Sequence, residues 1–460
     1  MTASVQNGVR RLVAAVSLNV FGSILTAIAG VGATSLMARK LPVGDFGRIL
    51  LLLTAVNAIA IFEGLRPVVI HRMAAGRESP HALFLATARI NAVMVIITLA
   101  CLILALLAGV GSDLSVIVDF ILCATIIVFF IVMQYWTFLD AEQDTVFTGL
   151  SRAGCWTAIY ISFIILASFG LDFAWYTFSI FLMHVVLAMI LRARLIYQGF
   201  MNKYKYGDYD GTVEPLFHQA ANNIAFNISA VTINVADRAI VGAIMGAGSA
   251  GLYAGPSELA LRAVGLIRAG VQVILPWAAR LSARDQERYW SLGALLSLIF
   301  VGSGCAILLL VRNWVAVLFL GDAFRAAGDL LGLFGLGILS ATLGYVCIIQ
   351  LNARGDFLVQ RRLYMAAAVL LIAGSIAGAF SGNLIHVAIA YLAARSVDLV
   401  LLALILYRLP TYIQRWFFSI GATLVLALVA SWNGLIWLAI FSLLLVWGLS
   451  GRFVQTIRGL

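Results

Sequence analysis

Charged and amide side chains recur at helical spacing within one apolar stretch, residues 219–276. If each residue of a helix advances by about 100°, six of them share about 100° of arc. These six are Gln219, Asn223, Asn227, Asn234, Asp237 and Arg238. Beyond Met245-Gly-Ala-Gly-Ser-Ala-Gly251, a second helix carries Glu258, Arg262 and Gln272 on one face, with Arg268 beside them. Guanidinium groups bind phosphate or carboxylate in pairs of hydrogen bonds, and amides bind hydroxyl groups or water. The stretch therefore predicts a site for a polar, anionic ligand.

The composition places this stretch in a membrane. Of the 460 residues, 63% are hydrophobic and only 11% are charged, whereas about 25% of a soluble domain is charged. The sequence therefore predicts an all-α polytopic membrane protein. Within lipid, a polar stripe must face protein or a water-filled cavity, and we expect such a cavity here.

Fourteen apolar segments are long enough to cross the hydrocarbon, which takes about 17–25 residues. They lie at 13–37, 47–70, 83–109, 115–138, 146–169, 173–196, 218–245, 252–277, 290–311, 328–350, 363–381, 385–407, 416–431 and 434–449. The first is too long for a cleaved signal peptide and is predicted to remain as a helix. The last two are the shortest crossings.

The positive charge is distributed unevenly between the two sides. With the N-terminus inside, nineteen of the thirty Lys and Arg residues fall in cytoplasmic loops and tails, and five fall in outer loops. The positive-inside rule then places both termini in the cytoplasm, and we expect a bacterial inner membrane. This placement accounts for the net charge of +10 without a nucleic-acid partner.

Two halves of the chain resemble each other. Leu41-Pro-Val-Gly44-Asp-Phe-Gly47 aligns with Met245–Gly251 at an offset of 204 residues, and each segment joins two long helices. The predicted organisation is an N-terminal six-helix lobe (1–197), a cytoplasmic linker (198–216), a C-terminal six-helix lobe (217–408), and two extra helices with a tail (409–460). An even number of helices per half makes the repeats parallel, an arrangement found in transporters. On the first helix, small residues at four-residue spacing predict close helix packing. They are Gly22, Thr26, Gly30 and Thr34.

Ten ionisable residues fall within the predicted crossings. They are Glu63, Arg66, Arg89, Asp237, Arg238, Glu258, Arg262, Arg268, Arg395 and Asp398. Since each unsatisfied charge costs about 2.5–3.5 kcal/mol in the membrane, they must be paired, hydrated or near its edges. The spacing predicts the pairs Glu63 with Arg66, Glu258 with Arg262, and Arg395 with Asp398. Six arginines against four acids leave an excess of positive charge, which favours an anion. The same residues also fit salt bridges that only lock helices together.

Sequence signatures of soluble-enzyme chemistry are absent. The sequence contains no GxxxxGK[ST], HExxH or GxSxG motif and no GxGxxG after a strand, and its five histidines are scattered. The five cysteines lie in apolar segments without paired spacing, so no disulfide, metal or cofactor is predicted. Because the sequence has no nucleotide-binding motif, the energy for any transport must come from an ion gradient, a substrate gradient or consumption of the product.

Two motifs resemble a known family. They are Asp237-Arg238-x-x-Val241-Gly242-x-x-x-Gly246-x-x-x-x-Gly251-Leu-Tyr253-Ala254 and Ala38-Arg39-Lys-Leu41-Pro-x-Gly-x-Phe46-Gly47. The chain looks like the polysaccharide transporters, the O-antigen and exopolysaccharide flippases of the multidrug/oligosaccharidyl-lipid/polysaccharide exporter superfamily. The resemblance implies a V-shaped pair of six-helix lobes around a cationic cavity. It also implies flipping of undecaprenyl-diphosphate-linked oligosaccharide to the periplasmic leaflet, alongside glycan polymerases and other assembly proteins. Arg48 departs from the expected pattern, and two extra helices also occur in the related peptidoglycan-precursor flippases.

The sequence therefore predicts a lipid-linked oligosaccharide flippase that works by alternating access and is not an enzyme. The expected substrate-binding residues are Arg89, Asn223, Asn227, Asn234, Arg238, Arg262, Arg268 and Gln272, and the expected ion-coupling residues are Asp237 and Glu258. One alternative is a multidrug or metabolite cation antiporter, which should have a net acidic cavity. Another is a membrane glycosyltransferase, glycan polymerase or ligase, which should carry a larger outer loop than any found here.

Overall fold

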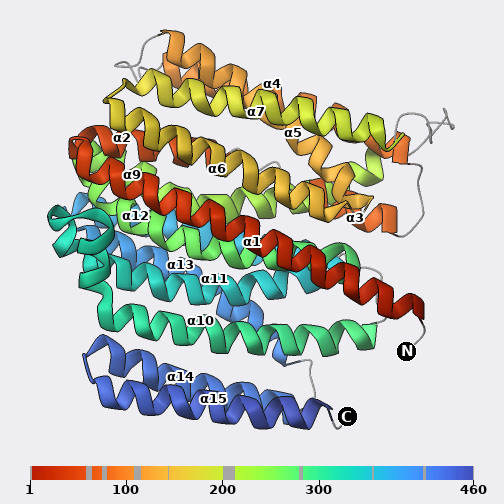
Figure 1. The fold of residues 1–460 in the computed structure, drawn as a ribbon, viewed down its shortest axis with the longest axis vertical. Coiled ribbons are helices and arrows are strands. Elements are labelled where there is room, and N and C mark those ends of the chain that lie inside the picture. The colour runs from red at the N-terminus through yellow and green to blue at the C-terminus, as the bar shows by residue number, and fades with distance from the viewer. Residues whose placement is uncertain are drawn as a thin grey trace.

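The structure is a computed structural model that describes residues 3–58, 65–74, 80–107, 116–142, 144–199, 213–278, 283–354, 357–407 and 411–458. The regular structure in these ranges is entirely helical (Figure 1). The first half contains α1 (Ala3–Lys40), α2 (Val43–Ala58), α3 (Leu65–Ala74), α4 (Pro80–Leu107), α5 (Val116–Ala141), α6 (Thr145–Phe169) and α7 (Phe173–Tyr197). The second half contains α9 (Val213–Ala278), α10 (Ala283–Leu320), the 3₁₀ helix η2 (Asp322–Ala327), α11 (Gly328–Arg354), α12 (Phe357–Phe380) and α13 (Leu384–Leu406). Two further helices, α14 (Thr411–Trp432) and α15 (Ile436–Arg458), end the chain.

Ten of the described helices are long and apolar enough to cross a membrane. Large apolar side chains on the outside of the bundle are exposed, among them Ile96, Val369 and Phe441. Such a surface fits lipid, and helices satisfy their own backbone hydrogen bonds there. The structure therefore confirms the prediction of an all-α polytopic membrane protein.

Apart from a few end residues, the described residues of the predicted crossings lie in helices. The second crossing contributes residues to both α2 and α3, and residues 59–64 between them lie outside the described part. The seventh and eighth crossings belong to one element, α9, which breaks at Gly246 (φ 84°, ψ 169°). Glycine adopts this positive φ without steric cost, so a single residue separates the two helices. Most of the predicted linker, residues 200–212, lies outside the described residues.

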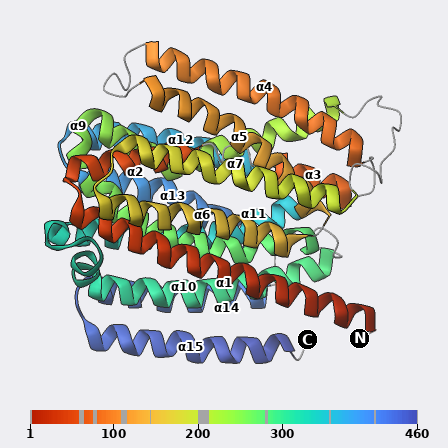
Figure 2. The same ribbon diagram turned by 45° about the horizontal axis from the view of Figure 1, so that its top comes forward.

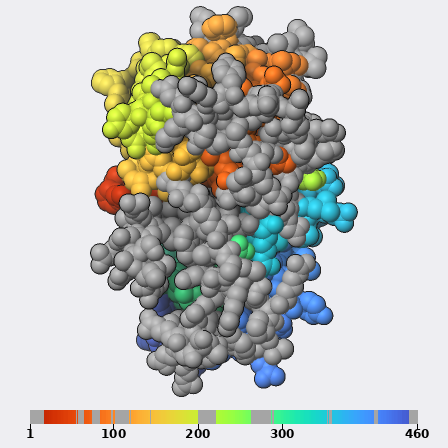
Figure 3. All heavy atoms as spheres, turned by 90° about the vertical axis from the view of Figure 1, so that its right-hand side faces the viewer, coloured from red at the N-terminus to blue at the C-terminus, as the bar shows by residue number. Residues whose placement is uncertain are grey.

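The two halves pack in the same way. In the first half α1 packs on α6, and in the second the part of α9 before Gly246 packs on α12, where the rings of Phe226 and Tyr364 are 4.8 Å apart. Likewise α5 packs on α7, and α11 packs on α13. Both chain termini lie at one end of the bundle (Figures 1 and 2). In the view onto that end, the coloured atoms of the first half lie mainly in the upper part and those of the second half in the lower part (Figure 3).

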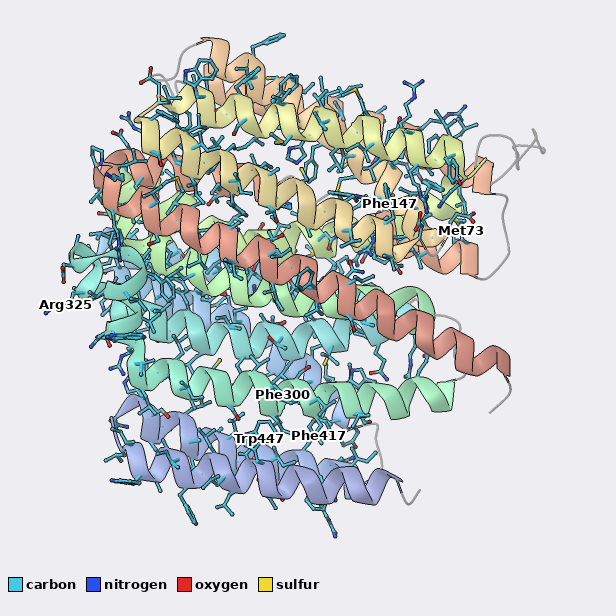
Figure 4. The ribbon with its side chains drawn as sticks, in the orientation of Figure 1. Met73, Phe147, Phe300, Arg325, Phe417 and Trp447 are labelled. Carbon is cyan, nitrogen blue, oxygen red and sulfur yellow. The ribbon has the colours of Figure 1, made fainter. Side chains whose placement is uncertain are left out.

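Helices α14 and α15 form a pair at the edge of the second half. The ring of Phe417 on α14 stacks on Trp290 of α10 at 6.4 Å, and Trp447 on α15 meets Phe300 of α10 edge-on at 5.1 Å (Figure 4). Because α10 supplies both contacts, the pair is an addition to the two-lobed core.

A reciprocal contact joins the lobes at the end opposite the termini. A Cβ atom added to Gly251 would lie 2.7 Å from the carbonyl oxygen of Val43, and one added to Gly47 would overlap the carbonyl oxygen of Ala247. Val43 and Ala247 are related by the same 204-residue offset as the two glycines. The two motifs therefore cross backbone to backbone, which requires glycine at both places. The rings of Phe46 and Phe324, 6.0 Å apart, pack beside this crossing.

Candidate functional site

The centre of the site is a buried ion pair within α9. The break at Gly246 folds the two parts of this element against each other, so that Arg238 meets residues about twenty positions further along the chain. Arg238 Nη1 donates to Glu258 Oε1 at 2.5 Å, while its Nε and Nη2 donate to Ser257 Oγ at 3.0 and 2.6 Å. Only 1% of Arg238 and 2% of Glu258 is exposed. A buried charge of this kind needs a partner, and the pairs predicted from spacing included none for Arg238.

Asp237 does not fill that role. Its Oδ2 accepts a hydrogen bond from the Tyr253 hydroxyl at 2.7 Å, and its Oδ1 accepts from the backbone N–H of Arg238 at 2.9 Å. The carboxylate is buried. Asp237 therefore ties the two parts of α9 together through Tyr253, beside the Arg238–Glu258 pair.

Arg262 extends the cluster from the second lobe to the first. Its Nη2 donates to Glu258 Oε2 at 2.8 Å, which confirms the predicted pair. Its Nη1 donates to the hydroxyl of Tyr160 on α6, and its guanidinium carbon lies 4.1 Å from the centre of that ring. Glu258 thus holds two guanidinium groups with one carboxylate. The Arg262 side chain keeps 13% of its surface exposed, more than either partner in the pair at Arg238.

A second part of the cluster lies between α9 and α13. Arg395 Nη1 lies 3.4 Å from Asp398 Oδ2, as predicted from their spacing, and Arg395 Nη2 donates to Asn234 Oδ1. The hydroxyl of Tyr364 on α12 donates to Asp398 Oδ1. This network joins one predicted ligand-binding amide, Asn234, to a buried arginine.

The predicted excess of positive charge is not found in this cluster. Among the described residues it holds three arginines and three carboxylates: Arg238, Arg262, Arg395, Asp237, Glu258 and Asp398. Their charges balance, so the expected surplus does not come from these residues. Any anion here must compete with a carboxylate that is already bound.

Arg66 contacts a carboxylate that its spacing did not predict. Its Nε donates to Asp140 Oδ2 at 2.7 Å, and Arg152 Nη2 donates to the same oxygen at 3.2 Å. Glu63, its predicted partner, lies outside the described residues. Asp140 was left out of the charge count because the predicted crossing ends at residue 138, whereas α5 continues to Ala141. This cluster joins α3, α5 and α6.

The remaining predicted residues are placed as follows. Asn223 is buried and Asn227 is partly buried, both on the first part of α9. Arg89 is exposed on α4, outside the buried cluster. The side chains of Gln219, Arg268 and Gln272 lie outside the described part of the structure, so their predicted roles stay predictions.

Sequence reasoning missed four residues that hold the charges, namely Tyr160, Tyr253, Ser257 and Tyr364. Each of these sits in an apolar run whose pattern resembles ordinary packing, and only the Tyr253 position is part of a quoted motif. Their hydroxyl groups satisfy buried charges that would otherwise be costly. Among the described side chains, no group of three or more His, Cys, Asp or Glu residues could hold a metal ion.

A scan against protein-family models and a search of curated proteins found no match. Solved structures do match. The lipid II flippase MurJ in an inward closed conformation aligns with a TM-score of 0.71 at 14% identity, covering 95% of this chain and 99% of that one. An outward-facing multidrug resistance MATE family transporter of the MOP superfamily aligns with a TM-score of 0.67 at 10% identity, covering 85% and 94%. A MOP superfamily transporter from Pyrococcus furiosus, described as having a binding pocket of reverse polarity, aligns with a TM-score of 0.66 at 12% identity, with the same coverage.

These similarities extend over nearly the whole chain, and they establish its fold class. The chain has the two-lobed helical fold shared by lipid II flippase MurJ and the MATE transporters, both of the MOP superfamily. At such low identity they show the fold alone.

Proposed function

We propose that this protein flips a polyprenyl-diphosphate-linked oligosaccharide across the bacterial inner membrane, with both termini in the cytoplasm. The observation that carries the proposal is Glu258, a single buried carboxylate shared by Arg238 and Arg262 where the lobes meet. Two guanidinium groups here share one carboxylate. A diphosphate has more acceptor oxygens and more negative charge than that carboxylate, so it could bind both groups more fully.

The extent of the MurJ match supports a lipid-linked substrate over a small solute. The MATE transporter covers 85% of this chain and MurJ covers 95%. Helices α14 and α15 contain 22 and 23 of the 460 residues. Together they make up about the same share of the chain as the difference between the two coverages. A helix pair beyond the two-lobed core, attached through α10, fits a protein that handles a long lipid tail at the edge of one lobe.

The proposed cycle begins with the exchange of one anion for another. The diphosphate binds Arg262 and then Arg238 as these arginines dissociate from Glu258. Glu258 or Asp237 then binds a proton or cation. Asn223, Asn227 and Asn234 contact sugar hydroxyls or ordered water, and Arg268, Gln272 and Arg89 line the route of the headgroup. The polyprenyl chain stays in lipid while the lobes rock between inward and outward openings.

Reconstituted translocation tests this proposal. Proteoliposomes loaded with a fluorescent polyprenyl-diphosphate trisaccharide would report flipping as the fraction of glycan that becomes accessible to an added glycosidase. Arg262→Gln should lower the initial rate by about 10- to 100-fold, as expected for loss of a charge-assisted hydrogen bond. Arg192→Gln removes an exposed arginine of α7 and serves as the matched control. Equal rates for both variants would overturn the assignment of Arg262 to substrate.

The balanced charge of the cluster favours one second candidate, a cation antiporter. The arginine excess had argued against it, and that excess is absent from the described cluster, which includes three buried carboxylates. The fold similarity to MATE transporters agrees. Proton-driven efflux of a cationic dye from the same vesicles, abolished by Asp237→Asn or Glu258→Gln, together with no flipping of the glycolipid, would favour this candidate.

A further inference from the structure

The contact between Arg262 and Tyr160 joins the two lobes deep in the bundle. Arg262 is on α9 in the second lobe, and Tyr160 is on α6 in the first. Their link combines a hydrogen bond from Nη1 to the phenol oxygen with a guanidinium lying 4.1 Å from the ring centre. Tyr160 is buried, with 3% of its surface exposed. Both interactions gain strength when water is excluded.

Gly30 makes room for this contact from a third helix. It lies on α1, and a Cβ atom added there would be 3.0 Å from Nε, Cζ and Nη1 of Arg262. A distance of that size is tighter than ordinary van der Waals contact, so an added methyl group would press on the guanidinium itself. Two turns and one turn earlier on the same ridge, Gly22 and Thr26 instead pack on α6. Gly30 therefore has a different neighbour from these two residues.

The guanidinium of Arg262 has three neighbours and one N–H group without an acceptor in the described part of the chain. Its Nη2 and Nη1 donate to Glu258 and Tyr160, and Gly30 leaves no room beside Nε, Cζ and Nη1 for a methyl group. Nε has no hydrogen-bond partner among the described residues. A buried N–H without an acceptor is costly, so this arginine gains from a ligand that offers it one more oxygen.

We propose that Tyr160 and Gly30 form a latch that holds the lobes together through Arg262 and that an arriving phosphate-type anion opens it. The anion supplies oxygens to Nε and Nη1, Arg262 leaves the phenol, and the first lobe loses its hold on the second. Substrate binding and lobe separation are then one event, because the same guanidinium cannot serve both partners. The nature of the anion rests on the proposed function, whereas the latch itself does not. Tyr160 and Gly30 act as positioning residues in this scheme.

Distance measurements between the lobes test the latch without any substrate. Spin labels introduced through non-canonical amino acids at Asp172, at the end of the first lobe, and at Asn383, at the same end of the second, would be read by pulsed electron resonance. Tyr160→Phe keeps the ring and removes the hydroxyl, so the population of separated lobes should rise about tenfold, the size expected for one hydrogen bond to a charged group. Gly30→Ala should produce the same shift, because its methyl group would press on the guanidinium of Arg262.

The chain offers a matched control on the same helix. A Cβ atom added to Gly32 would meet only Ile164 Cδ1, at 3.8 Å, so Gly32→Ala should leave the distance distribution unchanged. Wild-type distributions in both Tyr160→Phe and Gly30→Ala would overturn the latch.

The second arm adds inorganic pyrophosphate to the wild-type protein. The latch predicts a shift toward the distribution of Tyr160→Phe, and little further shift in that variant. If the variants separate the lobes and pyrophosphate does not move the wild type, opening by an anion is overturned while the mechanical contact stands. Loss of glycolipid flipping with the latch intact would count against the proposed function alone.

Discussion

The buried pair of Arg238 and Glu258 makes a quantitative prediction about stability. Removing one member of a buried ion pair typically costs about 3–5 kcal/mol, because the other charge is left without a partner. For Arg238→Met we expect about 3 kcal/mol, since Glu258 keeps Arg262 at 2.8 Å. For Glu258→Gln we expect about 5 kcal/mol, since two guanidinium groups lose their carboxylate together.

The double variant, Arg238→Met with Glu258→Gln, measures the coupling free energy of the pair. Arg262 keeps its contact with Tyr160 in this variant, so the loss of stability should be about 3 kcal/mol less than the sum of the two single losses. The free energy of unfolding would be measured in mixed detergent micelles by titration with a denaturing detergent, followed by circular dichroism.

An exposed pair of the same chemistry provides the control. Arg325 and Asp322 lie 2.9 Å apart, with 74% and 82% of their side chains exposed (Figure 4). Their cycle, made with Arg325→Met and Asp322→Asn, should give a coupling of about 0–1 kcal/mol. If the buried pair shows a coupling no larger than the exposed one, the buried contact is not the organising interaction of the site.

Three further outcomes follow from the packing. Gly47→Ala and Gly251→Ala should each lower the free energy of unfolding by about 1–3 kcal/mol through overpacking, while Gly44→Ala and Gly248→Ala, which meet nothing within 4 Å, should not. Asp140→Asn removes the carboxylate that both Arg66 and Arg152 contact, so the free energy of unfolding should fall by about 3–5 kcal/mol. An unfolding midpoint equal to that of wild type would contradict the pairing. A Cβ atom added to Gly302 would collide with Leu424 of α14, whereas one added to Gly304 meets nothing within 4 Å, so Gly302→Ala, and not Gly304→Ala, should lower the unfolding midpoint by loosening α14 from α10.

The sequence predicts those features that depend on neighbours along the chain. Fourteen apolar segments, the repeat at an offset of 204 residues and the pairs Glu258–Arg262 and Arg395–Asp398 all follow from spacing within one helix or from composition. Each is a local property of the sequence, because residues three or four apart on a helix must face each other. The shared end of the two termini follows equally from an even number of crossings.

Contacts between helices were beyond such reasoning. Arg238 reaches Glu258 only because α9 folds back at Gly246, and the register of that fold decides which side chain it meets. Arg262 reaches Tyr160 across 102 positions of sequence, through the packing of one lobe on the other. The helical period of 3.6 residues predicts neither the Arg238–Glu258 contact nor the Arg262–Tyr160 contact. Tyr160 is also uncharged, so it was not among the candidate residues.

The balanced charge of the described cluster changes the physical account of the site. Counting arginines and acids inside the predicted crossings gave a positive surplus, and that surplus was the argument for an anion. The six described charges of the cluster balance, while the side chain of Arg268, which belongs to that count, lies outside the described part. In this cluster Glu258 accepts hydrogen bonds from two guanidinium groups, those of Arg238 and Arg262. Each guanidinium has N–H groups that can donate to further oxygens. In the proposed function the anion replaces Glu258, and that exchange would be favourable only if the carboxylate were neutralised as the ligand enters. The proposal therefore requires anion binding and uptake of a proton or cation at Glu258 to occur together, so that the predicted coupling becomes a condition for binding.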